Sequence, residues 1–434
     1  MLLALSALLA TAKLMGELVR KLGQPPVAGE IAAGILLGPT VLGRFVPQAY
    51  AALFPTTGHV AVVIDAIATL SVVFFLLAAG LETRLRNILR QGKRSFLVSF
   101  FGGAFPFAVG LACGELFPTL LGAESFSNRH LFGLFLATAL SISALPVIAK
   151  TLMDLRLLDS EFGALVISSA MFDDLIGWIL FGIVMGMVNK AAGASVGSFA
   201  SSGTLRTVLM VLIFVAFTLT LGRWLIAKAL LAIQVHSSGQ GAALGFVFSL
   251  ALASGAFAEY AGIHAIFGAF IVAIAIGDSI PERKAGAGSS KDLRFGKQST
   301  DLQDLAQNIR QIVTNVFAPF FFANISLRTD FVANFSLRVT LVLVLVACLG
   351  KVLGATWGAR LAGMEKSSAL AVGFAMNARG AMEMVLGVLA LRAGLIGERL
   401  FVALVIMALF TSLVSGPAIQ ALLGHNRALA ANSR

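Results

Sequence analysis

The sequence has 434 residues, of which 58% are hydrophobic and 12% are charged, and its formal net charge is +11. Soluble domains carry about 25% charged residues, so the composition excludes an ordinary soluble protein. The positive charge does not indicate nucleic-acid binding, because the basic residues lie in short loops between apolar segments, where they orient a membrane chain. Cys113 and Cys348 both lie in apolar segments, which argues against a disulfide framework or a cysteine-rich metal site.

Apolar segments of about 20 residues, the length that crosses a bilayer, recur along the whole chain. Hydropathy predicts about thirteen such spans. They run over 2–20, 27–43, 60–80, 95–116, 130–152, 162–187, 204–234, 240–257, 263–280, 305–327, 337–362, 366–391 and 398–424. The first span lacks the basic start of a signal peptide, so we expect it to be retained. The predicted fold class is an all-α polytopic membrane protein.

Basic residues are divided unequally between the loops. Loops after odd-numbered spans contain Arg20, Lys21, Arg84, Arg86, Arg90, Lys93, Arg94, Arg156, Arg283, Lys284, Lys291, Arg294, Lys297 and Lys366. The alternate loops contain Arg44, Arg129, Lys190, Arg206, Arg328, Arg338 and Arg399. Because cytoplasmic loops of membrane proteins are enriched in Lys and Arg, we expect an inner-membrane protein with its N-terminus outside and its C-terminus in the cytoplasm.

One stretch between the spans is clearly polar. Residues 281–304 are rich in Gly, Ser and Lys and are predicted to form a cytoplasmic linker. The rest of the chain, 1–434, is expected to be a single transmembrane domain. Few residues follow the last span, so we expect no soluble regulatory domain there.

Five charged residues lie near the centres of predicted spans. They are Asp173, Asp174, Lys351, Arg379 and Glu383. A charge at a helix centre costs about 2.5–3.5 kcal/mol on insertion scales, so these residues must pair, face the protein interior or line water. Arg379 and Glu383 are four residues apart, which favours a structural ion pair on one helix face. Two carboxylates and one lysine leave an acid over, which indicates an ion or proton site.

Adjacent residues of a helix point about 100° apart. Asp173 and Asp174 therefore cannot both face Lys351. We expect one acid to pair with the lysine and the other to face a cavity, where a carboxylate holds its proton more tightly than in water. Such a group can release a proton when it takes up a cation, which is the chemistry of an exchanger.

Two spans contain helix-breaking sequences near their centres. One contains Ser141, Ser143 and Pro146, and the other contains the run Asn377-Ala378-Arg379-Gly380. Proline removes a helical hydrogen bond, and serine hydroxyls can satisfy freed carbonyls. Broken helices at corresponding places in two halves of a chain are typical of transporters and mark the binding site.

Several short motifs occur in order along the chain. They are Leu22-Gly23-Gln24-Pro25-Pro26-Val27-Ala28-Gly29-Glu30, Gly34-Ile35-Leu36-Leu37-Gly38-Pro39, Ala79-Gly80-Leu81-Glu82, Ala139 to Pro146, Phe172-Asp173-Asp174, Gly262 to Phe270, Gly350-Lys351-Val352-Leu353-Gly354 and Met376-Asn377-Ala378-Arg379-Gly380. With these motifs the chain resembles the monovalent cation:proton antiporters, especially the branch that contains Kef-type potassium exchangers and NapA-like sodium exchangers.

The resemblance implies a fold of two inverted repeats, with a dimer-forming panel and a mobile core bundle in which the two broken helices cross. It implies that Asp174 alternately holds the cation and the proton, and that Asp173 pairs with Lys351. It further implies that Ser141, Ser143 and Asn377 line the crossing and that Glu383 offsets the positive helix ends there.

The expected function is exchange of Na⁺ or K⁺ for H⁺ by a homodimer, through an elevator-like movement and without a cofactor. Many relatives carry Asn or Gln where this chain has Asp173, so the pattern resembles the sodium-type, charge-moving exchangers. A Kef-like potassium exchanger without its nucleotide-binding domain and a cation channel are the alternatives. An aspartyl protease needs two carboxylates that share a proton, and neighbours on one helix diverge, so we expect no enzyme activity.

The loop charges predict the side of the membrane on which the linker lies. A cysteine placed between positions 285 and 300 should react with a membrane-impermeant maleimide only after the cytoplasmic side is opened. Labelling in intact cells would contradict both the orientation and the number of spans.

Overall fold

The structure is a computed structural model of the whole chain. It describes residues 1–21, 25–55, 57–82, 85–121, 129–158, 160–191, 204–236, 240–261, 265–280 and 304–432. The predicted linker therefore lies outside the described residues up to position 303, as do Leu22–Gln24 and Gly262–His264 of the sequence motifs.

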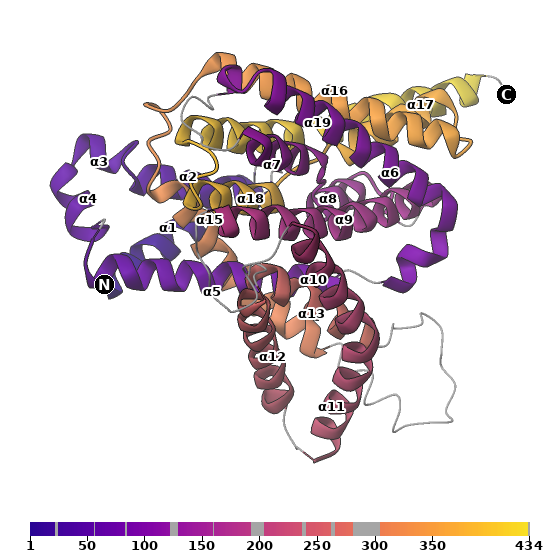
Figure 1. The fold of residues 1–434 in the computed structure, drawn as a ribbon. Helices are drawn as coiled ribbons and strands as arrows, with labels where there is room; N and C mark the ends of the chain where they lie inside the picture. Colours follow the sequence, from indigo (N-terminus) through magenta and orange to yellow (C-terminus); the bar gives the residue numbers. More distant parts are fainter. Residues whose placement is uncertain are drawn as a thin grey trace. The chain divides into compact units, whose positions relative to one another are not determined.

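The regular structure of the described residues is helical throughout (Figure 1). The first half contains α1 (Leu2–Lys21), α2 (Pro26–Leu37), α3 (Leu42–Phe45), α4 (Pro47–Leu53), α5 (His59–Glu82), α6 (Leu85–Leu116), η1 (Thr119–Leu121), α7 (Arg129–Ser141), α8 (Leu145–Asp154) and α9 (Glu161–Ala191). The second half contains α10 (Thr204–Phe217), η2 (Thr218–Gly222), α11 (Arg223–His236), α12 (Gln240–Tyr260), α13 (Ala265–Ser279), η3 (Val313–Phe317), α15 (Ala318–Leu327), α16 (Leu337–Leu361), α17 (Lys366–Met376), α18 (Ala381–Arg392) and α19 (Glu398–Asn432). Residues 304–312 are also helical.

Ten helical segments of the described residues are long and apolar enough to cross a membrane. The other three predicted spans also coincide with helices. Span 263–280 is α13, an apolar helix of 15 residues. Span 305–327 is divided by a π-helical turn, η3, and span 366–391 is interrupted between α17 and α18. The prediction of an all-α polytopic membrane protein is confirmed.

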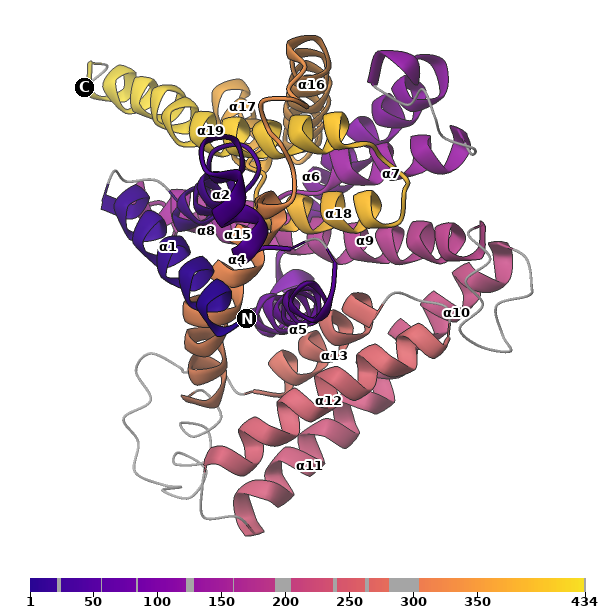
Figure 2. The ribbon, with the colours of Figure 1, turned by 90° about the vertical axis from the view of Figure 1, so that its left-hand side faces the viewer.

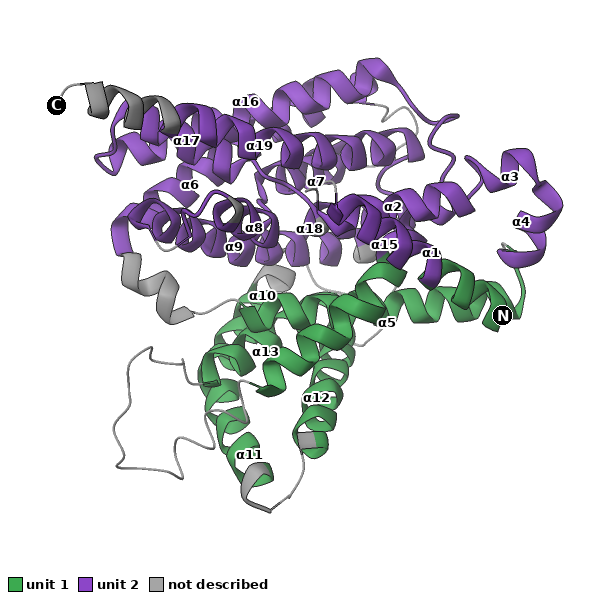
Figure 3. Ribbon diagram, turned by 180° about the vertical axis from the view of Figure 1, so that it is seen from behind, with its two compact units in different colours: residues 1–9, 55–86, 189–321 green, residues 10–54, 87–188, 322–434 purple. Residues whose placement is uncertain are grey.

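The chain divides into two compact units, each assembled from separate stretches (Figure 3). Unit 1 comprises residues 1–9, 55–86 and 189–321, and unit 2 comprises residues 10–54, 87–188 and 322–434.

In unit 1, α13 lies between α5 and α12 (Figure 2). Its residues from Ile266 to Gly277 are all buried. The close packing depends on glycine, because a Cβ atom at Gly80 of α5 would lie 2.5 Å from the Cβ of Ala273. The pair Arg223–Asp278 joins α11 to the end of α13.

In unit 2, α16 presses against α6 through a row of glycines one turn apart. A Cβ atom at Gly354 would lie 2.3 Å from the backbone oxygen of Phe101, and one at Gly358 would lie 2.4 Å from that of Leu97. These distances are far shorter than carbon–oxygen contacts allow, so only glycine fits. Lys351 lies on α16 next to this row of glycines. The close approach of the two helices places its side chain in the interior of unit 2, where it is 0% exposed.

The contact between α16 and α6 predicts that Gly354→Ala lowers the temperature of thermal unfolding of the purified protein, because overpacking costs about 1–3 kcal/mol. Gly397→Ala is the matched control, since nothing lies within 4 Å of a Cβ atom at that position. Equal unfolding temperatures for the two variants would contradict this account of the packing.

Candidate functional site

The first helix break separates α7 from α8. Helix α7 ends at Ser141 and α8 begins at Leu145, so residues 142–144 are not helical. Pro146 lies in the first turn of α8, where the missing N–H group is not needed and the fixed φ angle suits a helix start. The proline therefore starts the second half-helix rather than kinking a continuous one. Ser141 and Ser143 are both buried.

The second break separates α17, which ends at Met376, from α18, which begins at Ala381. The two breaks are in direct contact, because the backbone N–H of Ala144 donates to the backbone oxygen of Ala378 at 2.9 Å. Ser143 Oγ also lies 2.8 Å from the backbone oxygen of Met376. The predicted crossing of two discontinuous helices is confirmed.

Gly380, in the second break, lies against the start of α8. A Cβ atom at this position would lie 2.8 Å from Cγ2 of Val147 and 3.4 Å from Cβ of Ala144. Its backbone is extended, so the glycine is required by space rather than by an unusual conformation.

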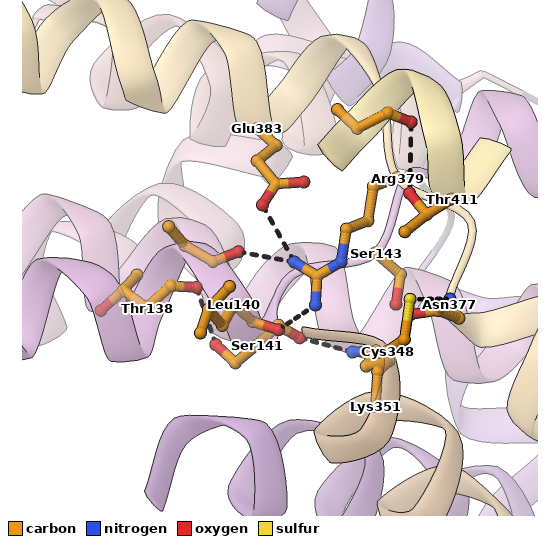
Figure 4. Close-up of polar contacts among 12 residues, drawn as sticks. Thr138, Leu140, Ser141, Ser143, Cys348, Lys351, Asn377, Arg379, Glu383 and Thr411 are labelled. Atoms are coloured by element: carbon orange, nitrogen blue, oxygen red, sulfur yellow. Dashed lines mark hydrogen bonds and ion pairs between the residues drawn. The ribbon is translucent and has the colours of Figure 1, made fainter. Parts of the chain in front are cut away.

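The end of α7 is capped by two cationic side chains (Figure 4). The guanidinium of Arg379 donates to the backbone oxygens of Ala139 at 3.0 Å and Leu140 at 2.5 Å. Lys351 Nζ donates to the backbone oxygen of Ser141 at 2.5 Å. The last carbonyls of a helix have no partner within the helix and carry partial negative charge. Two buried cations therefore satisfy the last carbonyls of a buried helix end.

Arg379 also pairs with Glu383, at 3.0 Å between NH1 and Oε1 (Figure 4). Both side chains are buried, with exposed fractions of 0% and 2%. Glu383 lies in the first turn of α18, where a negative charge interacts favourably with the positive end of the helix.

Asp173 of α9 forms an ion pair with Lys351 of α16. Its Oδ2 also accepts a hydrogen bond from Ser143 at 2.8 Å, and its Oδ1 accepts one from Ser99 of α6 at 2.6 Å. Buried charges are costly unless they are paired and hydrogen-bonded, and this carboxylate has donors on both oxygens. Asp173 thus joins α6, α9, α16 and the break after α7.

Asp174 is the next residue of α9 and is 2% exposed. Its side chain leaves the helix about 100° away from that of Asp173. The negative charges of both aspartates act on Lys351.

The structure thus brings together Ser141, Ser143, Asp173, Lys351, Asn377, Arg379 and Glu383. Three contacts around this cluster were not predicted. Ser99 binds Asp173, Cys348 Sγ lies 3.4 Å from Asn377 Nδ2, and Ser412 of α19 donates to the backbone oxygen of Arg379. Cys348 precedes Lys351 by one helical turn, a spacing that places both on one face of α16.

Comparison with known proteins identifies the family of the chain. The family described as "Sodium/hydrogen exchanger, transmembrane" matches residues 4–425. The chain belongs to the sodium/hydrogen exchanger family. It is therefore a transporter-family protein with several membrane spans and not an enzyme.

Two relatives illustrate the range of the family. Cation/H(+) antiporter 17 of Arabidopsis thaliana is 28% identical over 433 residues, which cover 99% of this chain and 49% of that protein. Na(+)/H(+) antiporter NhaS4 of Synechocystis sp. is 29% identical over 417 residues, which cover 95% of this chain and 94% of that protein. The chain spans about half the length of the first curated relatives it matches.

The fold is similar to the solved structure of the sodium proton antiporter MjNhaP1 from Methanocaldococcus jannaschii. The TM-score is 0.64 at 16% sequence identity, and the match covers 96% of each chain. This likeness supports the predicted fold class.

Proposed function

We propose that this protein exchanges a monovalent cation, sodium by preference, for protons across the inner membrane, with Asp174 as the group that holds cation and proton in turn. The observation that carries the proposal is that two neighbouring buried carboxylates, Asp173 and Asp174, have different surroundings at the helix crossing. Asp173 is bound by Lys351, Ser143 and Ser99. Asp174 is buried beside it but points in a different direction.

The charge balance of the cluster supports the same reading. Arg379 and Lys351 are cationic, whereas Asp173, Asp174 and Glu383 are acidic, and all five side chains are buried. With every group ionised, the cluster has one negative charge in excess. One proton or one monovalent cation makes it neutral, and an uncompensated charge is costly in this setting. The proton and the monovalent cation therefore compete for the same site in the cluster.

Transport also requires that the site face each side of the membrane in turn. All the cluster residues belong to unit 2, so the site travels with one compact unit in the elevator-like movement that we propose. Unit 1 supplies the helices that we assign to the dimer-forming panel. A bound cation would complete its oxygen shell with backbone carbonyls and hydroxyls at the crossing, as ion sites in membranes do.

Potassium exchange is the second candidate, because the relative from Synechocystis is named a Na(+)/H(+) antiporter, whereas a relative from Saccharomyces cerevisiae is named K(+)/H(+) antiporter 1. The acid at position 173 favours sodium, by its resemblance to the sodium-type branch. Purified protein in liposomes with an internal pH dye, challenged in turn with sodium, potassium and lithium, separates these cations. A channel would conduct the cation without moving protons in the opposite direction.

Asp174→Asn removes the group proposed to exchange cation for proton. Exchange in liposomes should fall to the level of empty vesicles, while the protein still folds. Asp65→Asn is the control, because it makes the same change in α5 of unit 1 and should leave exchange intact. Wild-type exchange should also weaken at acid pH, since protons compete with the cation for the carboxylate. Substantial exchange by Asp174→Asn would exclude this residue as the carrier.

The pair Asp173–Lys351 leads to a prediction about charge movement. If cation binding at Asp174 loosens the pair, Lys351 can lose its proton, because burial disfavours a charged amine that has no partner. Each cation would then displace more than one proton, and an imposed membrane potential should change the rate of proton movement in liposomes.

Lys351→Gln is the comparison variant for the voltage experiment, since its side chain carries no proton to release. A wild-type rate that does not respond to voltage would show that Lys351 is a fixed structural charge and that exchange is electroneutral.

A further inference from the structure

Ser99 is the contact of Asp173 that comes from α6. It is 1% exposed, and its hydroxyl donates to Oδ1 of Asp173 at 2.6 Å. The two helices are packed at this level, because the rings of Phe96 and Phe172 meet edge to face, with centroids 6.1 Å apart. One turn further along α6, Gly103 has no side chain, and a Cβ atom there would lie 4.0 Å from the same oxygen. Ser99 is therefore the α6 side chain that binds this oxygen.

The bond made by Ser99 is not the one that a serine in a helix usually makes. Serine and threonine hydroxyls inside helices commonly donate to the carbonyl oxygen one turn earlier. In this protein Thr138 donates to Leu134 at 2.8 Å, and Ser169 donates to Leu165 at 2.8 Å. Ser99 instead donates across the helix interface to a buried carboxylate, where hydrogen bonds are worth more than between neutral groups.

The two oxygens of Asp173 are held from different sides. Oδ2 accepts from Lys351 and Ser143, whereas Oδ1 accepts from Ser99. A carboxylate bound at both oxygens cannot turn about its last torsion angle without breaking a bond. With the Ser99 bond removed, the carboxylate is held at Oδ2 alone, so that Oδ1 can swing about that oxygen toward its neighbour on α9.

We propose that Ser99 is a positioning residue for exchange, which holds Asp173 toward Lys351 and so reserves Asp174 for the transported cation. This inference rests on the proposed exchange function, because it assigns a reason for the different roles of the two aspartates. Without Ser99, Asp173 turns toward the cation and becomes an additional anionic ligand. The cation then binds more tightly and is released more slowly.

The test compares Ser99→Ala with wild type in the liposome assay over a range of sodium concentrations. We expect the half-saturating sodium concentration to fall by about tenfold or more, as the loss of a hydrogen bond to a charged group suggests. The maximal rate should fall as well, since release becomes slower. Ser99→Thr keeps the hydroxyl and should restore both values.

Ser95→Ala is the matched control. Ser95 lies one turn before Ser99 on α6 and is 0% exposed, and its hydroxyl makes no hydrogen bond to any residue that the structure describes. This variant should retain the wild-type half-saturating concentration. If Ser99→Ala has an unchanged or higher half-saturating concentration, or behaves like Ser95→Ala, the positioning role is overturned.

Binding is also measured without transport, as the sodium-dependent rise in the unfolding temperature of purified protein. The sodium concentration that gives half of the rise should be lower in Ser99→Ala than in wild type, and equal values would overturn the inference. This measurement stands even if wild-type liposomes show no exchange, which would count against the proposed function alone.

Discussion

Four helix ends buried at one place impose the constraint on which the rest of unit 2 depends. The breaks after Ser141 and Met376 leave backbone carbonyls and N–H groups without partners, and a membrane interior offers no water to satisfy them. Each break supplies part of what the other lacks, through the bond from Ala144 to Ala378. Charged side chains supply much of the rest, which explains why charges are present at the depth where they are least favourable.

These charges form a connected set. Arg379 and Lys351 cap the end of α7, and each is balanced by a carboxylate, Glu383 and Asp173. The structural ion pair expected for Arg379 and Glu383 is present, but it also binds the crossing, so it is part of the site's framework. Asp174 lies beside this framework, and it brings the formal charge of the five buried groups to −1 when all of them are ionised. The proposed cation site therefore arises from the same groups that stabilise the broken helices.

Much of this arrangement could be predicted from the sequence. Spans are visible in hydropathy because each needs a long apolar run, and the breaks are visible because Pro146 and Gly380 interrupt such runs. Elimination left two acids, Asp173 and Asp174, as possible partners of Lys351, since few charges lie at its depth. The family resemblance supplied the assignment of Asp173 to Lys351, and the structure contains that ion pair. The roles of Asp174, Ser141, Asn377 and Glu383 in transport stay predictions.

Contacts between helices could not be predicted in the same way. Whether Ser99 faces Asp173, its own helix or lipid depends on the rotation of α6 about its axis, and a single serine in an apolar span does not determine that rotation. The contact between Ser412 and the backbone of Arg379 could not be predicted for the same reason, because it depends on the rotation of α19. Glycine rows such as Gly350, Gly354 and Gly358 indicate a close contact, but they do not tell which helix is the partner.

If one buried site holds either a cation or a proton, binding of the cation must release the proton. Counting the protons released on cation binding is therefore the most direct test. Purified protein in weakly buffered detergent is mixed with sodium chloride or with choline chloride, and a pH dye reports the release. Sodium, but not choline, should release protons from the wild type, and Asp174→Asn should release none. Sodium binding to the wild type without proton release, with binding shown by a rise in unfolding temperature, would contradict a shared site.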